Sequence, residues 1–316
     1  MSVLNDIPLV SVIIPNYCHA RFLNERIQSV LQQTYQNFEL IILDDCSPDG
    51  GASKAVIESY RDNPHVSHIV YNEINSGSAF KQWGKGFELA QGKYIWIAES
   101  DDCCAPELLD ALMGQLLEHQ AVMAFCRSEK FDVNGVKSYY DWQDELSGSF
   151  VMDGSVFIKK YLSYHNRIAN ASSVVFRREA AMRVDPFYMQ MCAEGDWLFW
   201  IMMAEFGRVR FVDNALNFFR YHETNTTTIN THNGISIKEH KHVYSYLVGK
   251  AYLNSKESLI LRARLSHAFS MQLFDKKNIQ EVMRLWDPYH LYRLLYHLLK
   301  FKGNTFDKII GRFSVR

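Results

Sequence analysis

The sequence YIWIAESDD, residues 94–102, joins a short apolar run to three carboxylates within four residues. Residues 94–98 have the composition of a buried strand, and Pro106 then opens a helix-like segment. Clustered acids at the end of a buried strand are unfavourable, because like charges repel and removing them from water is costly. A divalent cation resolves the conflict, and adjacent carboxylates at a strand's carboxyl end suit Mg²⁺ or Mn²⁺ that also holds a phosphate. A solvated acidic turn is the alternative interpretation of this stretch.

The first hundred residues alternate between strand and helix patterns. Strands are predicted at Val10–Ile14, Phe38–Leu43, Val66–Tyr71 and from Tyr94, and helices at Phe22–Gln33, Ala52–Tyr60 and Ala79–Leu89. Such β-then-α units with nearly continuous apolar strands predict an α/β fold with a doubly wound, mostly parallel sheet. The loops that follow the strands then lie at one edge of the sheet, where ligands bind. Three of these loops carry polar clusters: Asn16-Tyr17, Asp44-Asp45 and Asp101-Asp102.

Composition narrows the class of protein. The 316 residues suffice for one large α/β domain plus an appendage, and the net charge of −1 gives no reason to expect a nucleic-acid partner. No apolar run reaches the roughly 20 residues of a membrane-spanning helix, and the first residues do not resemble a secretory signal. The six cysteines show no CxxC spacing, which favours free thiols in a reducing compartment. We therefore expect a cytoplasmic protein.

The first loop excludes two common nucleotide-binding classes. A nicotinamide dehydrogenase needs G-x-G-x-x-G between its first strand and first helix, but the loop at residues 15–20 reads PNYCHA. A Walker A loop is absent as well, and a nucleotidyltransferase is disfavoured because its glycine-rich first loop is missing. Phosphate must instead be held by a metal ion and basic side chains.

Five motifs occur in an order that resembles one known family. They are VSVIIPNY (residues 10–17), FELIILDDCS (38–47), NSGSA (75–79), ESDD (99–102) and EGDW (194–197). Together they resemble the family 2 glycosyltransferases, which have the GT-A fold, over about residues 8–222. The resemblance implies a catalytic domain at residues 1–229, a helical extension at 230–316, and inverting transfer of a sugar from a nucleotide-diphosphate donor.

The donor base is expected at the first two loops. Asp45 could accept a hydrogen bond from a ring N–H of uracil or thymine, so a UDP or dTDP sugar is favoured. Guanine also has ring N–H groups that could make this bond. Tyr17 and the backbone of Pro15 and Asn16 could flank the ring, since an aromatic side chain offers a stacking face. An Asx turn that leads into Pro48 is the alternative explanation for the two aspartates.

The diphosphate and its metal are expected at the fourth strand. By family position Asp101 resembles the ribose contact and Asp102 the ligand to Mg²⁺ or Mn²⁺. His222 follows a strand-like segment and could be a further metal ligand or a phosphate donor. Lys81 and Lys85 lie on the helix after Gly77 and could face the diphosphate, although a solvated helix face explains at least one of them.

The catalytic base is expected at Asp196. Aspartate is a favoured N-cap residue, and capping alone would explain its place before an apolar helical run. The family pattern puts its catalytic carboxylate at this position, and inverting transfer needs one base to deprotonate the acceptor hydroxyl. Gly195 separates it from Glu194, where family members often have adjacent acids. Trp197 could pack on an acceptor sugar or fix the helix in the core, and residues 170–173 are expected to face the acceptor.

The C-terminal region is predicted to be helical from Ser236 onward. Residues 287–302 carry a stripe of leucines with tyrosines nearby. Residues 287–316 hold six basic side chains against two acidic ones, so 6 − 2 gives +4. This pattern suits an anionic membrane surface, and packing on the catalytic domain or on a second copy in a homodimer is the alternative. A membrane role would suit a lipid-linked acceptor and a peripheral position on the inner face of the cell membrane.

Processive members of the family carry a Gln-x-x-Arg-Trp motif and transmembrane helices, and neither is present in this sequence. The prediction is therefore a metal-dependent inverting enzyme of the bacterial surface-polysaccharide type that adds a single sugar to a glycan or lipid-linked acceptor. The alternative from another class is a catalytically silent sugar-nucleotide or glycan-binding module that recruits partners through its C-terminal helices. Intact Asp45, Asp102 and Asp196 argue against it.

Overall fold

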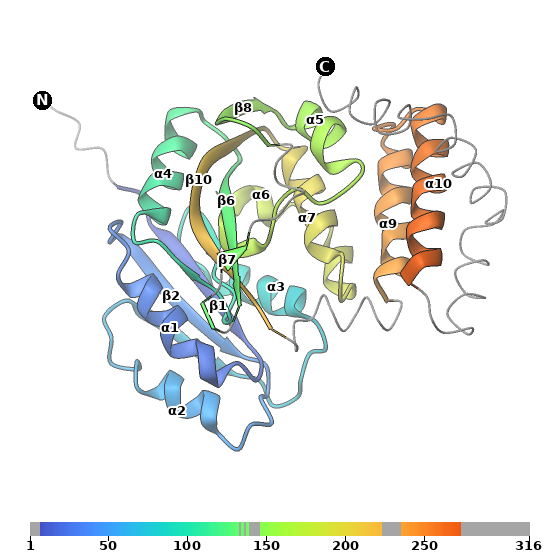
Figure 1. Cartoon of the computed structure of the whole chain (residues 1–316). Coiled ribbons are helices and arrows are strands. Elements are labelled where there is room, and N and C mark those ends of the chain that lie inside the picture. The colour runs from blue at the N-terminus through green and yellow to red at the C-terminus, as the bar shows by residue number, and fades with distance from the viewer. Residues whose placement is uncertain (1–6, 133, 136, 139–145, 223–234, 273–316) are drawn as a thin grey trace, which may run out of the picture.

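The computed structural model of the chain describes residues 7–132, 134–135, 137–138, 146–222 and 235–272 (Figure 1). A single sheet forms its centre, with the strand order β3-β2-β1-β4-β9-β6-β10-β5, while β7 pairs with β6 and β8 with β10. The strands are β1 Val10–Asn16, β2 Phe38–Asp44, β3 Val66–Tyr71, β4 Tyr94–Ile97, β5 Cys103–Cys104, β6 Met123–Asp132, β7 Lys137–Ser138, β8 Phe150–Asp153, β9 Val174–Arg177 and β10 Arg208–Tyr221.

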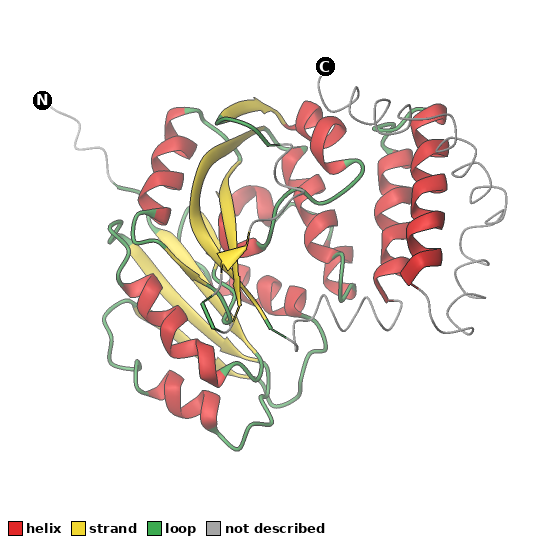
Figure 2. Cartoon of the chain, viewed as in Figure 1, coloured by secondary structure: helices red, strands yellow, loops and turns green. Residues whose placement is uncertain are grey.

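Helices cover both faces of this sheet (Figure 2). They are α1 Ala20–Leu31, α2 Ala52–Glu58, α3 Ala79–Leu89, α4 Leu108–Glu118, α5 Gly154–Phe157, α6 Arg178–Ala181, α7 Gly195–Ala204, α9 Ile235–Gly249 and α10 Ser255–Gln272. A π-helical turn, η2, spans Ile158–Leu162, and 3₁₀ turns occupy Ala171–Ser173 (η3) and Pro186–Gln190 (η4). The β-α units predicted in the first hundred residues are confirmed, most of their ends lying within two residues of the predicted ones.

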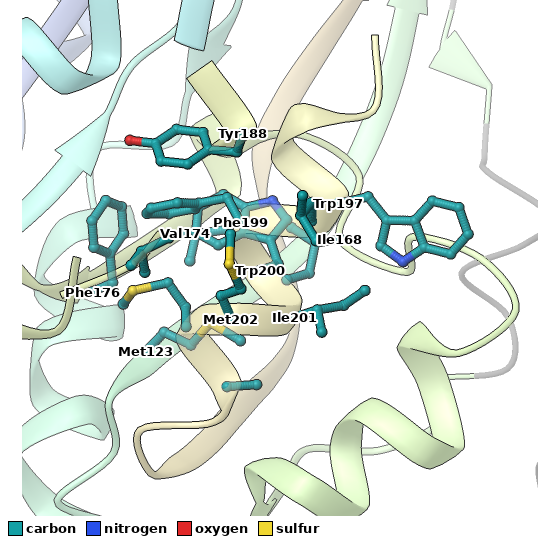
Figure 3. Packing of buried hydrophobic residues seen from close by; sticks show 14 of the residues in the cluster. Met123, Ile168, Val174, Phe176, Tyr188, Trp197, Phe199, Trp200, Ile201 and Met202 are labelled. Carbon is teal, nitrogen blue, oxygen red and sulfur yellow. The ribbon is translucent and has the colours of Figure 1, made fainter. Parts of the chain in front are cut away.

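Alternation along the strands separates two hydrophobic cores. Val12 and Ile14 of β1 pack with α1, α2 and α4, whereas Ile13 faces the core formed with α3 and α7. The core formed with α3 and α7 is rich in aromatic side chains. Figure 3 shows Trp200 and its neighbours in this core. Fully burying one such large apolar side chain contributes roughly 1.5–3 kcal/mol, so these two cores fix the positions of the loops at the sheet edge.

The sheet is parallel on one side and mixed on the other. Strands β2 and β4 both pair in parallel with β1, and β3 pairs in parallel with β2. Strand β9 runs antiparallel to β4 and to β6, which returns the chain to the same sheet. The predicted α/β class with a mostly parallel sheet is confirmed, and the parallel pairing places the loops after β1, β2, β3 and β4 at one edge.

The C-terminal helices share a core with the domain that precedes them. Side chains of α9, namely Val243, Tyr244 and Leu247, belong to the same buried cluster as those of α7. Figure 1 shows α9 and α10 side by side, with α9 nearer to α7. Among the described residues no helix is both long and apolar enough to cross a membrane. The leucine stripe and basic residues of 287–316 lie outside the described residues.

Candidate active site

Asp44 fixes the first two loops to each other. Its carboxylate accepts hydrogen bonds from Asn16 Nδ2 (2.7 Å) and from the Ser47 backbone N–H (3.0 Å) and hydroxyl (2.7 Å). These bonds are the turn interactions expected of an aspartate at this place, and they hold the chain of β1 against that of β2. Tyr17 remains 46% exposed at the tip of the first loop, so its ring face is accessible to a ligand.

Asp45 organises the loop after β3. It is buried, and it accepts hydrogen bonds from Asn72 Nδ2 (2.6 Å), the backbone N–H of Ser76 (2.9 Å), the Ser76 hydroxyl (2.7 Å) and Gln82 Nε2 (2.9 Å). A base N–H would have to join or replace one of these donors. The carboxylate therefore lies at the junction of the second loop with residues 72–82.

The two predicted lysines bind this same loop. Lys81 Nζ donates to the carbonyl oxygen of Ser76 (2.8 Å), and Lys85 Nζ donates to Asn72 Oδ1 (2.5 Å). Each ammonium group thus helps to shape residues 72–76 in the structure. The role predicted for Lys81 at the diphosphate stays a prediction.

The carboxylates after β4 separate into different environments. Burial, reinforced by Asp101 and Asp102, raises the pKa of Glu99 to about 8, and its side chain accepts a hydrogen bond from Trp83 Nε1 (3.0 Å). Glu99 is therefore mostly protonated at neutral pH, which removes one charge from the cluster. Arg26, fully buried on α1, adds a positive charge that partly offsets this shift.

Asp102 is fully buried and surrounded by protein donors. Its carboxylate accepts hydrogen bonds from the Ser172 hydroxyl (2.6 Å), the Arg220 backbone N–H (3.0 Å) and Asn170 Nδ2. Burial and the neighbouring Asp101 raise its pKa to about 7. Asn170 and Ser172, expected to face an acceptor, are instead buried against this carboxylate.

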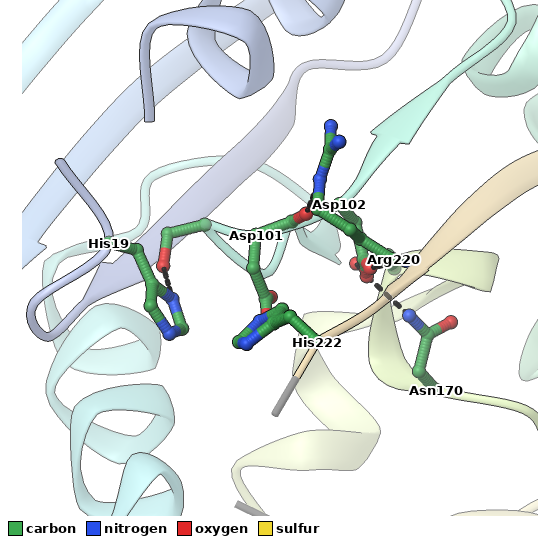
Figure 4. Close-up of polar contacts among 8 residues, drawn as sticks. His19, Asp101, Asp102, Asn170, Arg220 and His222 are labelled. Carbon is green, nitrogen blue, oxygen red and sulfur yellow. Dashed lines mark hydrogen bonds and ion pairs between the residues drawn. The ribbon is translucent and has the colours of Figure 1, made fainter. Parts of the chain in front are cut away.

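Asp101 points toward two histidines (Figure 4). Its Oδ2 lies 3.0 Å from His222 Nε2, and one potential ligand atom each from His19, Asp101 and His222 lie within 4.8 Å of one another. Burial alone would raise the pKa of Asp101, but the bond with His222 and the nearby His19 hold it below its usual value. Nδ1 of His19 is 2.9 Å from the Ser100 hydroxyl. The three side chains could hold a divalent ion.

Sequence reasoning did not single out His19. It ends the loop after β1, and the topology argument that brought the other loops to this edge applies to it equally. Arg26 was missed as well, because a charged residue on an amphipathic helix gives no signal that it is buried. The structure thus adds a second histidine and a buried cation to the predicted Asp101, Asp102 and His222.

Asp196 lies in the first turn of α7. Its carboxylate accepts hydrogen bonds from Asn166 Nδ2 (2.9 Å) and the Trp197 backbone N–H (2.7 Å). Burial and the nearby Glu194 raise its pKa to about 7, so it titrates in the range that suits a general base. The residue before the helix is Glu194, and Asp196 is not the N-cap that its position in the sequence suggested.

Neighbouring side chains explain the unusual glycine in this motif. A Cβ on Gly195 would lie 2.5 Å from the Phe80 ring and 2.8 Å from the carbonyl oxygen of Tyr188. A side chain at position 195, and with it a carboxylate directly before Asp196, therefore has no room. Trp197 is buried and donates from Nε1 to the carbonyl oxygen of Leu162 (2.8 Å), so it fixes the helix in the core and presents no open face to a sugar.

The segment before α7 contacts both the loop at residues 76–78 and α9. The Ser78 hydroxyl donates to the Met191 carbonyl oxygen (2.6 Å), which links residues 76–78 to the chain leading to Asp196. On the other side, the Glu239 carboxylate of α9 accepts the backbone N–H groups of Cys192 (2.7 Å), Ala193 (2.8 Å) and Glu194 (2.8 Å). No pattern in the sequence indicates the second contact.

Comparison with known proteins supports the resemblance. The profile of the family described as "Glycosyl transferase family 2" matches residues 11–185, more than half of the chain. TuaG of Bacillus subtilis (strain 168), a glycosyltransferase whose name places it in teichuronic acid biosynthesis, is 36% identical over 118 residues, which are 37% of this chain and 46% of TuaG. The glycosyltransferase GlyG of Streptococcus pneumoniae serotype 4 is 30% identical over 142 residues, covering 45% of this chain and 42% of GlyG. The chain thus spans less than half the length of these two relatives.

The structural comparison concerns the fold. The crystal structure of S. aureus TarS residues 1–349 in complex with UDP-GlcNAc superimposes with a TM-score of 0.60 at 20% sequence identity, covering 85% of this chain and 74% of that one. At this identity the likeness shows a shared GT-A architecture. The family profile, which matches more than half of the chain, establishes that the chain belongs to glycosyl transferase family 2.

Proposed function

We propose that this protein is an inverting, metal-dependent glycosyltransferase that moves one sugar from a nucleotide-diphosphate donor to a glycan or lipid-linked acceptor. The observation that carries the proposal is the contrast between Asp101, kept ionised beside two histidines, and Asp196, whose pKa is about 7. Inverting transfer needs a base for the acceptor hydroxyl, and a bound ion would neutralise the charge of the leaving group.

On the donor side, Asp45 and Tyr17 are the proposed contacts for the base. The carboxylate of Asp45 would receive the ring N–H of uracil or thymine, and the exposed ring of Tyr17 would stack on the base beside the backbone of Pro15 and Asn16. We favour UDP or dTDP, and the TarS crystal structure, which contains UDP-GlcNAc, makes that nucleotide sugar a sensible first probe.

Asp101 and His222 are the side chains that we propose as protein ligands of Mg²⁺ or Mn²⁺, with His19 as a third. The ligand atoms of the three side chains lie within 4.8 Å of one another, and an ion would take the place of the hydrogen bond between Asp101 and His222. When bound, the ion would stabilise charge on the departing diphosphate. Asp102 was also predicted as a ligand, but to bind the ion it would have to give up hydrogen bonds from protein donors. We therefore assign Asp102 to holding Arg220 and the end of β10 beside His222.

Asp196 is the proposed base. Burial raises its pKa to about 7, close to the operating pH, which is the range in which a carboxylate serves best as a general base for a hydroxyl. Asn166 holds one carboxylate oxygen and the Trp197 N–H the other, which fixes the direction in which the base presents its lone pairs.

The acceptor and the location of the protein are part of the same proposal. The name of TuaG suggests a bacterial surface polysaccharide, for which the acceptor would be a glycan or lipid-linked glycan. The excess positive charge of residues 287–316 suits an anionic membrane surface on the cytoplasmic side, with a homodimer as the alternative use of the leucine stripe.

A ligand screen followed by a turnover assay tests the proposal. Thermal-shift measurements with UDP, dTDP and GDP sugars, each with and without Mn²⁺, should show a metal-dependent rise in melting temperature for one nucleotide class. The selected donor should then release its nucleotide slowly to water, and faster with a suitable acceptor. A rise in melting temperature without release of nucleotide under any of these conditions would instead indicate a binding module.

A further inference from the structure

Glu239 makes three contacts with the backbone just before the proposed base. Its carboxylate is 8% exposed and accepts hydrogen bonds from three consecutive backbone N–H groups, at 2.7, 2.8 and 2.8 Å. These amides belong to Cys192, Ala193 and Glu194, whereas Glu239 lies on α9, 45 to 47 residues further along the chain. A carboxylate that accepts several backbone N–H groups forms strong, directional, charge-assisted bonds.

The N-cap residue of α7 does not cap the helix with its own side chain. Glu194 occupies that position and makes no side-chain capping bond. Glu239 supplies an acceptor from another helix. We propose that Glu239 is a positioning residue for the catalytic base: by holding the amides of residues 192–194, it fixes the place of Asp196 two residues later. This inference rests on the proposed function, in which Asp196 is the base.

A second contact from α9 reaches the same place. The ring of the adjacent His240 lies 5.3 Å from that of Trp197, edge to face, and its Nδ1 is 3.4 Å from Glu194 Oε1. Residues on both sides of Asp196 therefore touch α9. A base must lie within hydrogen-bond reach of the hydroxyl that it deprotonates, and a displacement of about 1 Å can lower a rate about 10²-fold.

Glu205 provides a matched control. It follows the other end of α7 and accepts hydrogen bonds from Tyr246 (2.9 Å), Lys250 (3.2 Å) and Tyr252 (3.1 Å) of the C-terminal region. It thus ties the same two parts of the molecule together, but from the end of the helix remote from Asp196. If the contacts of Glu205 and Glu239 served only to hold α7 against the C-terminal helices, Glu205→Gln and Glu239→Gln should change kcat and the melting temperature to a similar degree.

The experiment compares Glu239→Gln, Glu205→Gln, Asp196→Asn and the double variant Glu239→Gln/Asp196→Asn in the full chain. Metal-dependent release of UDP from UDP-GlcNAc, or from another nucleotide sugar selected in the thermal-shift screen, gives kcat and KM. Hydrogen exchange of the peptide that contains residues 191–197 reports directly on the three amides, whether or not a donor is turned over.

We expect Glu239→Gln to lower kcat about tenfold or more with little change in donor KM, and to speed exchange of amides 192–194. Glu205→Gln should do neither, even if it lowers the melting temperature more. In the Asp196→Asn background, Glu239→Gln should have little further effect, because residues that act through one group are not additive. If Glu239→Gln does not fold, Glu239→Asp, whose carboxylate is one methylene further from the amides, should show the same changes to a smaller degree.

Several results would overturn the inference. They are an unchanged kcat in Glu239→Gln, equal losses in the two glutamine variants, or a full further loss on top of Asp196→Asn. The proposed function fails separately, because then Asp196→Asn itself would retain activity. Unchanged exchange of residues 192–194 in Glu239→Gln would refute the structural basis of the inference without reference to any substrate.

Discussion

Asp101 and Asp196 are the same residue type, each at the edge of a packed core, yet their pKa values are shifted in opposite directions. Both are removed from water, which raises the pKa of a carboxyl group. Beside Asp101, His222 and His19 more than compensate for burial, so its pKa falls. Beside Asp196 the nearest charge is the like-charged Glu194, so its pKa rises to about 7. The neighbours therefore decide which aspartate can serve as a permanent anion and which can exchange a proton.

The largest expected effect comes from removing the base. Asp196→Asn should lower turnover by roughly 10² or more, as is typical for loss of a general base. Because burial raises the pKa of Asp196 from 3.8 to about 7 in the folded state, this group costs stability increasingly between those two pH values and fully at pH 8, and the amide removes that cost. The free energy of unfolding at pH 8, measured in urea, should therefore equal or exceed that of the wild type. An active but destabilised variant would show that Asp196 is structural.

Replacing the other aspartate should affect the metal. Asp101→Asn is expected to weaken Mn²⁺ binding by about 10–100-fold and to lower turnover accordingly, because it removes the ionised oxygen beside His222. Titration of Mn²⁺ by electron paramagnetic resonance measures this directly. His19→Ala should weaken binding by a smaller factor, of about tenfold. If Asp102→Asn abolished Mn²⁺ binding while Asp101→Asn preserved it, the ligand would be Asp102, as first predicted from the sequence.

The pH profile separates the two aspartates without mutation. Turnover at saturating donor and Mn²⁺ should fall as the pH drops through about 7, because Asp196 becomes protonated and can no longer accept a proton. Well below that pH the loss should approach tenfold per unit, while Asp101 stays ionised because its pKa is lowered. The Asp196→Asn variant should lose this limb of the profile. An identical limb in that variant would assign the titration to another group.

The smallest expected change concerns the glycine beside the base. A Cβ at Gly195 would collide with the Phe80 ring, so Gly195→Ala should lower the free energy of unfolding by ~1–3 kcal/mol. Gly114→Ala on α4 is the control, because nothing lies within 4 Å of that Cβ, and it should stabilise by roughly 0.5–1 kcal/mol. Urea unfolding of both variants checks the difference. Equal stabilities would mean that Phe80 moves aside at little cost.

The first half of the sheet could be predicted from sequence because its signals are local. Each strand there is an apolar run closed by polar or turn residues, as at Asp44 and Asp45, and each helix follows at once. The right-handed connection of such units then placed the loops with Asp45 and Asp101 at one edge. Topology alone thus brought the loops with Asp45 and Asp101 to the same edge of the sheet.

The rest depends on contacts between distant residues. Strand β9 enters the sheet antiparallel directly after the 3₁₀ turn η3, and no periodicity in Val174–Arg177 shows which strands it joins. Glu239 is one acid on a helix, and nothing near it in the sequence indicates that it meets residue 192. Asp196 was located by resemblance to the family, and the surroundings that set its pKa, Asn166 among them, became visible only in three dimensions.

The contact between Glu239 and the segment before α7 also has a consequence for protein synthesis. A ribosome makes residues 192–194 at least 45 residues before it makes Glu239. While α9 is still inside the exit tunnel, the three amides near the proposed base cannot donate their hydrogen bonds to the Glu239 carboxylate. The segment before α7 therefore acquires its three bonds to Glu239 only when α9 has emerged and docked.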